Sequence, residues 1–91
     1  MDFEWDEEKA KANLKKHKIS FEEAATVFGD SLSSTFPDPD HSLDEDRFIT
    51  IGTSGRGRIL MVSHTDREGR SRIISARKAK PHERKVYEEE K

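Results

Sequence analysis

Two arginines flank a short apolar segment near the C-terminus of the chain. Arg72 and Arg77 enclose Ile73–Ala76 in the stretch RIISARKAK, and Lys78 and Lys80 follow directly. The planar guanidinium group of arginine can bind a phosphate through two parallel hydrogen bonds. This stretch therefore has the residue types that bind a polyanion.

The spacing of the two arginines separates their roles. A regular strand directs Arg72 and Arg77 to opposite faces, so they can bind one phosphate together only if a bulge or the strand end intervenes. Arg77 is the stronger candidate, because it lies where the strand meets the loop before the last helix. Its alternative role is an ion pair with a helical acid such as Glu83 or Glu23. For Arg72, a salt bridge at the strand end is as good an explanation as a catalytic role.

His64 is a candidate for proton transfer. It ends the preceding strand-like segment on the face of Leu60 and Val62. The unperturbed pKa of histidine, near 6.5, suits general acid or base catalysis. A half-buried structural histidine, or a residue at the end of a hairpin, would fit the same position.

The charge of the chain is divided unevenly along its 91 residues, a length that predicts one domain with a thin core. The formal net charge is −2, yet residues 1–45 hold twelve acids and five bases, whereas residues 46–91 hold seven acids and twelve bases. Every arginine lies in the second half. This asymmetry favours a polyanion on one face, although a solvated face without a ligand explains it equally well.

Several classes of protein are excluded by composition. The chain has no cysteine, which rules out disulfides and zinc–thiolate sites and fits a reducing compartment. It has no apolar run of the ~18 residues that a membrane helix needs, and its N-terminus is acidic where a secretory signal is basic. We therefore expect a cytoplasmic protein. The acidic loop 37–46 lacks the glycine of an EF-hand loop and contains two prolines, so we expect no metal site.

The elements that must position these residues follow from the hydrophobic pattern. Asp6 caps a predicted helix over 7–17, and Ser20 with Glu23 opens a second helix that ends at Gly29. A short strand precedes them at Phe3–Trp5. The other predicted elements are strands at Leu32–Phe36, Arg47–Thr53, Arg58–Thr65 and Arg72–Ala76, and a last helix over His82–Glu90 after Pro81.

This order, β-α-α-β-β-β-β-α, predicts an α+β fold in one domain over residues 1–91. We expect a small twisted antiparallel sheet with the helices packed on one side. The uncovered side is then free to bind a ligand.

The motifs in this order resemble those of a known family. The segments that carry the resemblance are FEWDEEKAKANLKKHKISFEEAATVF, PDPDHS, EDRFITIG, GRILMVSHTDR and RIISARKAKPHERKVYE, and they run from Phe3 to about Glu88. Together they resemble the BrnT family of bacterial toxins from type II toxin–antitoxin pairs. The resemblance implies a RelE-like fold and a ribonuclease that arrests translation. It also implies a BrnA-type ribbon-helix-helix antitoxin, through which alone the toxin would meet operator DNA.

Metal-free RNA cleavage needs a base for the 2′-OH proton, groups that stabilise charge on the phosphoryl oxygens, and an acid for the leaving 5′ oxygen. We predict that no cofactor takes part and that the catalytic residues are Arg77, His64, Arg72 and Tyr87. The position of Tyr87 resembles that of functional residues near the end of RelE-like toxins, although it could simply be core. The predicted RNA-binding residues are Arg56, Arg58, Arg67, Lys78 and Lys80.

A binding module remains the competing hypothesis. The chain lacks an unmistakable acid–base pair, so an RNA- or protein-binding domain without catalysis would also fit. Such a module would bind RNA in a salt-sensitive manner and would not cleave it.

Overall fold

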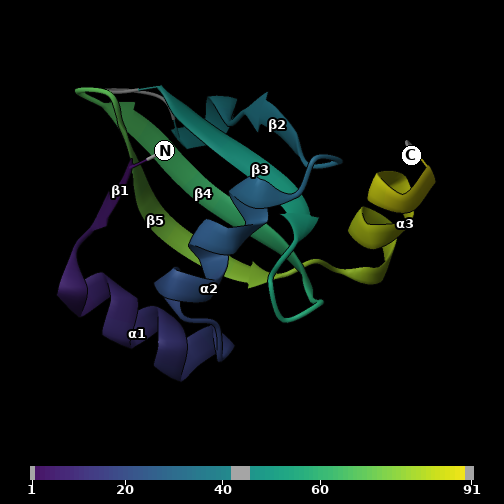
Figure 1. Cartoon of the computed structure of the whole chain (residues 1–91), viewed down its shortest axis with the longest axis horizontal. Coiled ribbons are helices and arrows are strands. Elements are labelled where there is room, and N and C mark those ends of the chain that lie inside the picture. The colour runs from purple at the N-terminus through teal and green to yellow at the C-terminus, as the bar shows by residue number, and fades with distance from the viewer. Residues whose placement is uncertain (1, 42–45, 90–91) are drawn as a thin grey trace.

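The computed structural model describes residues 2–41 and 46–89, and it confirms an α+β fold (Figure 1). Besides α-helices and strands, the described part of the chain contains two short 3-10 helices, η1 and η2. The elements are β1 (Asp2–Trp5), α1 (Glu7–His17), α2 (Phe21–Thr26), η1 (Val27–Gly29), β2 (Ser34–Pro37), η2 (Pro39–His41), β3 (Arg47–Thr53), β4 (Ile59–Arg67), β5 (Arg70–Lys78) and α3 (Pro81–Glu89).

The five strands form one mixed sheet in the order β1-β5-β4-β3-β2. Strands β2 to β5 pair antiparallel, but β1 pairs with β5 in parallel. The prediction of a purely antiparallel sheet is therefore wrong. The reason is topological: β1 continues into two helices instead of a tight turn, and such a long connection allows a parallel pairing.

Helices α1 and α2 cover one side of the sheet, which we call the core face. Its buried strand residues are Leu60 and Val62 of β4 and Ile73 and Ala76 of β5. They pack against Ile19, Phe21, Ala24 and Val27 from the helical segment. These apolar side chains form the hydrophobic core of the domain.

Buried Asn13 of α1 fastens the helix to β5. Its side-chain amide donates to the carbonyls of Ile19 and Ala76, both at 2.9 Å, and its oxygen accepts from the backbone N–H of Ala76 at 3.1 Å. The backbone next to Arg77 is thereby held on the helix. Because the side-chain amide of Asn13 has hydrogen-bond partners for both its nitrogen and its oxygen, its burial costs little free energy and fixes the position of this backbone.

A β-bulge in β5 changes which face the arginines occupy. Ser63 pairs with Ser75 while His64 pairs with Ile73, so Ile74 is an extra residue without a partner on β4. Ile73 and Ala76 consequently share the core face. Arg72 and Arg77 both lie on the other side, which we call the opposite face. The strand is thus not regular, and the bulge, which the sequence left open as an exception, brings the two arginines to one face.

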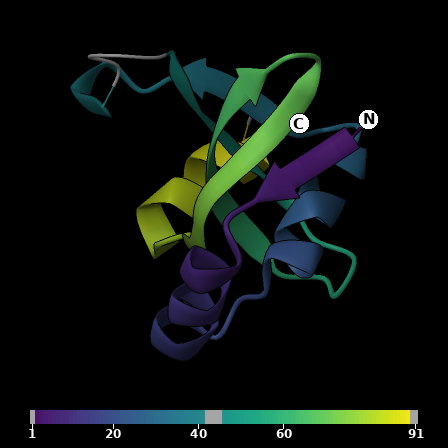
Figure 2. The same ribbon diagram turned by 90° about the vertical axis from the view of Figure 1, so that its left-hand side faces the viewer.

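Helix α3 packs on the opposite face, and Figure 2 shows it on the other side of the sheet from α2. It meets Ile49, Ile51 and Met61, which alternate along β3 and β4 with residues of the core face. The prediction that the helices lie on one side is thus wrong for α3. After β5 the chain continues into α3 from Pro81, on this side of the sheet.

Candidate functional site

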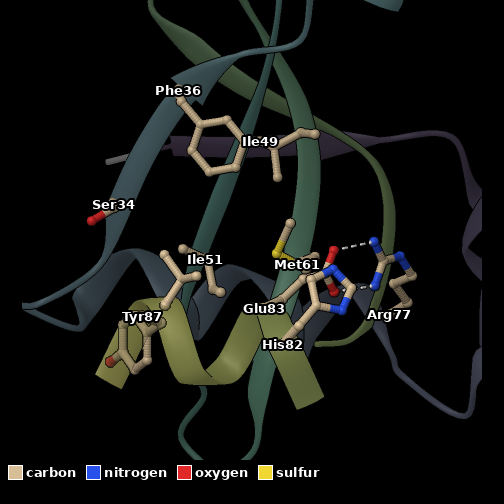
Figure 3. A pocket seen from close by; sticks show the side chains of 10 residues that line it. Ser34, Phe36, Ile49, Ile51, Met61, Arg77, His82, Glu83 and Tyr87 are labelled. Carbon is tan, nitrogen blue, oxygen red and sulfur yellow. Dashed lines mark hydrogen bonds and ion pairs between the residues drawn. The ribbon is translucent and has the colours of Figure 1, made fainter. Parts of the chain in front are cut away.

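A cavity of about 470 Å³ lies between α3 and the opposite face (Figure 3). The sheet contributes a mostly apolar floor, and the first turn of α3 contributes charged and polar groups at one end. The lining residues are Ser34, Phe36, Ile49, Ile51, Met61, Arg77, His82, Glu83, Val86 and Tyr87. A concave apolar site with a few polar groups is typical of ligand-binding sites.

Arg77 lies at the charged end of the cavity. Its Nη1 and Nη2 donate to the two carboxylate oxygens of Glu83 at 2.8 and 2.9 Å, and Nη1 also donates to the Lys78 carbonyl at 3.2 Å. Three of its five N–H donors are used in this way. The remaining two, on Nε and Nη2, form the second edge of the guanidinium plane. This edge is free to bind an oxyanion in a bidentate manner, and the side chain is 36% exposed.

Glu83 holds this arrangement as a carboxylate. It accepts from Arg77 and also, at 2.7 Å, from the backbone N–H of Lys80 at the start of α3. The hydrogen bonds from Arg77, with a smaller contribution from Lys80, lower the pKa of Glu83 to about 2. Glu83 therefore stays charged at any physiological pH and orients Arg77.

His82 lies beside this pair and was not among the candidates named from the sequence. It is exposed, it lines the same cavity as Arg77, and its charge acts on Glu83. Figure 3 shows its ring next to the Arg77–Glu83 pair. The available signal was its position five residues after Arg77, at the start of the predicted helix.

Arg72 shares the opposite face with Arg77 but is bound to another acid. Its Nη1 donates to Glu4 Oε2 of β1 at 2.9 Å, and Arg70 approaches the other oxygen of Glu4 at 3.9 Å. The structure therefore shows Arg72 in a salt bridge at the strand end, one of the two roles that the sequence left open. Arg72 remains 30% exposed at its side chain and adds positive charge to this face.

His64 lies on the core face, which argues against the catalytic role predicted for it. The side chain is 4% exposed and lies between the rings of Phe28 and Phe48, with centroids at 4.9 and 5.9 Å. Its Nε2 is 2.8 Å from Thr50 Oγ1. Burial lowers the pKa of His64 below the usual value for histidine. The sheet itself separates His64 from Arg77.

Tyr87 is buried and its hydroxyl group is engaged. It donates to the carboxylate of Asp30 and lies 3.1 Å from Thr53 Oγ1. Burial and the hydrogen bond to Asp30 raise the pKa of Tyr87. These contacts fasten α3 to the rest of the domain, so they argue for a structural role and against the proton transfer predicted for Tyr87.

The predicted RNA-binding residues fall into two groups. Arg58 donates to both oxygens of buried Glu23, one of them at 2.9 Å from Nε, and this pairing argues against an RNA contact. The sequence analysis had considered Glu23 as a partner of Arg77, but the acid lies on the core face. The four exposed residues, which are free to reach a ligand, are Arg56, Arg67, Lys78 and Lys80.

Neither a metal cluster nor a membrane helix is found in the part of the chain that the structure describes. In residues 2–41 and 46–89, no three His, Cys, Asp or Glu side chains gather as metal ligands. Within the same ranges, no helix has the length and apolar character to cross a bilayer.

Comparisons with known proteins agree on one family. The family model described as "Ribonuclease toxin, BrnT, of type II toxin-antitoxin system" matches residues 5–83. The crystal structure of the Brucella abortus ribonuclease toxin, BrnT, is similar, with a TM-score of 0.70 and 25% sequence identity. The similarity covers 88% of this chain and 97% of the Brucella chain. No curated protein matches by sequence.

Proposed function

The chain belongs to the BrnT family of ribonuclease toxins from type II toxin–antitoxin systems, and from this we propose that it cleaves RNA on the opposite face of its sheet without a metal ion. The observation that carries the proposed location is the bulge at Ile74. Because of it, Arg77 shares one accessible face with Arg72 and meets the first turn of α3.

Arg77 binds the scissile phosphate in this proposal. Its Glu83-bound edge is fixed, and the edge formed by Nε and Nη2 receives two non-bridging oxygens of the phosphate. Donors that are oriented in advance stabilise the negative charge that builds up there in the transition state. Glu83 is then a positioning residue that acts through Arg77.

In this proposal His82 performs a proton transfer in the reaction. The 2′ oxygen attacks phosphorus and loses its proton to a base, while the bond from phosphorus to the 5′ oxygen breaks and that oxygen gains a proton. Imidazole can perform either transfer near neutral pH, and His82 is the exposed histidine that lines the cavity with Arg77. The products are a 2′,3′-cyclic phosphate and a 5′-hydroxyl end.

The partners of the chain follow from the family. A ribonuclease toxin of a type II toxin–antitoxin system implies an RNA substrate and an antitoxin partner. We further propose that this antitoxin is of the BrnA type with a ribbon-helix-helix domain, that it alone connects the toxin to operator DNA, and that free toxin arrests translation. Growth arrest upon expression, relieved by co-expression of the neighbouring reading frame, would test these points.

RNA cleavage in EDTA tests the activity itself. Purified protein should cut single-stranded RNA in the presence of the chelator and leave 2′,3′-cyclic phosphate ends. The alternative is a non-catalytic RNA-binding module of the same fold. It predicts binding that weakens with salt and no cleavage at any protein concentration.

A further inference from the structure

We propose that the cavity between α3 and the opposite face holds one unpaired nucleobase of the RNA, next to the phosphate that Arg77 binds. This inference rests on the proposed ribonuclease function and names the group that its site recognises. Nothing in the family description specifies such a subsite.

The floor of the cavity suits the flat, largely apolar face of a base. Met61 of β4 pairs directly with Arg77 of β5, so the floor begins one strand spacing, about 5 Å, from the phosphate-binding arginine. Ile49 and Ile51 of β3 extend this floor toward β2. A volume of about 470 Å³ is large enough for one base with its sugar.

Phe36 provides a ring against which the base can stack. It lies on edge strand β2, opposite Ile49, and it is 41% exposed although it is a large apolar residue. Aromatic rings that remain exposed at the mouth of a cavity stack with unpaired bases in many RNA-binding proteins. In Figure 3 the ring lies across the floor from Arg77, so that Phe36 and Arg77 bracket the cavity.

The two ends of the cavity differ in polarity, and this difference favours a nucleotide over a protein segment as the occupant. At one end are the free edge of Arg77 and the ring of His82, which suit a phosphate. The acid at that end, Glu83, already accepts from Arg77 and from the Lys80 backbone. Toward β2 the lining is apolar, apart from Ser34. A nucleotide matches both ends, because its phosphate is anionic and the face of its base is largely apolar.

Met61 allows a direct test, because it and Met1 are the only methionines of the chain. Protein with ¹³C-labelled methionine methyl groups is titrated with a single-stranded 2′-O-methyl RNA tetranucleotide, which lacks the attacking hydroxyl group. The methyl resonance of Met61 should shift as the RNA binds. In Phe36→Ala the affinity should fall about 5-fold to 150-fold, the range of one base–aromatic stack.

Leu14→Ala is the matched control, because Leu14 is a similarly exposed apolar residue of α1, outside the cavity. Its affinity for the RNA should equal that of the wild type. The inference is overturned if the Met61 resonance stays in place at saturating RNA, or if Phe36→Ala binds as tightly as Leu14→Ala. It is also overturned if the antitoxin, but not the RNA, shifts the Met61 resonance, since the cavity then serves a protein.

The test is separate from that of the proposed function. If the wild type cleaves RNA in EDTA, but the Met61 resonance does not shift and Phe36→Ala does not lower the affinity for RNA, the activity stands and the base site is wrong. If Met61 responds to the RNA but no cleavage occurs, the base site stands and the ribonuclease mechanism is wrong.

Discussion

Among single residues, the guanidinium group of Arg77 has two uses in the proposed site. Arg77 uses one edge for Glu83 and keeps the other for an oxyanion. The sequence analysis treated an ion pair with Glu83 and phosphate binding as alternatives. The structure makes them compatible, because arginine has more donors than one carboxylate can accept.

His82→Asn tests proton transfer. Asparagine keeps a polar side chain of similar size but has no pKa near neutrality, so the cleavage rate should fall about 10²-fold to 10⁴-fold. Single-turnover cleavage at neutral pH measures this loss. Affinity for the 2′-O-methyl RNA should change little. His17→Asn on α1 is the control, and a wild-type cleavage rate in His82→Asn would exclude this role.

His64 should make the stability of the fold depend on pH. Burial lowers its pKa in the folded state, so the unfolded state binds a proton more readily. The free energy of unfolding should therefore fall as the pH drops below about 6.5, by at most about 1.4 kcal/mol per pH unit, until the lower folded pKa is passed. In His64→Gln this decrease should be smaller. Urea denaturation at pH 7.5, 6 and 5 measures both proteins, and identical pH dependence would contradict the assignment.

At the scale of elements, the bulge in β5 decides which residues face the core and which face the cavity. Strand periodicity predicted β5 itself and the position of Arg77 at its end. It could not predict the bulge, because the extra residue is defined by pairing with β4 and by the bonds from Asn13 to Ala76. These are tertiary contacts that the local pattern does not contain. The side on which α3 packs is likewise set by tertiary contacts, among them the bonds of Tyr87 to Asp30 and Thr53.

The two neighbouring isoleucines test the bulge with the same chemical change. Ile73 is 1% exposed in the core, whereas Ile74 is the half-buried extra residue. Ile73→Ala should lower the free energy of unfolding by about 2–5 kcal/mol. Ile74→Ala should cost clearly less. Chemical denaturation of both variants provides the comparison, and equal losses would mean that β5 has no such bulge.

In the molecule as a whole, part of the basic second half gathers on one face of the sheet. Arg70, Arg72 and Arg77 of the second half lie along the opposite face, where Glu4 of the first half pairs with Arg72. The sequence could predict that the second half binds a polyanion, because net charge survives folding. It could not assign each arginine, since only folding pairs Arg58 with Glu23 and Arg72 with Glu4.

Salt dependence tests whether Arg72 belongs to the RNA track. For binding of single-stranded RNA, log K falls with log salt by about 0.7 for each phosphate contact. If RNA displaces Glu4 from Arg72, the variant Arg72→Ala should reduce this slope by about 0.7. Lys11→Ala, on exposed α1, should leave the slope unchanged. A slope in Arg72→Ala equal to that of the wild type would assign Arg72 to the salt bridge alone.

Single-turnover RNA cleavage by Arg77→Lys in EDTA tests whether the proposed site is built around Arg77. Lysine keeps the positive charge but cannot hold Glu83 with one edge and a phosphate with the other. We expect a cleavage rate about 10²-fold to 10³-fold below that of the wild type, the usual effect of losing one transition-state donor, whereas Arg84→Lys, on the exposed surface of α3 outside the cavity, should cut normally. If Arg77→Lys cuts RNA as fast as the wild type, the site is not built around Arg77.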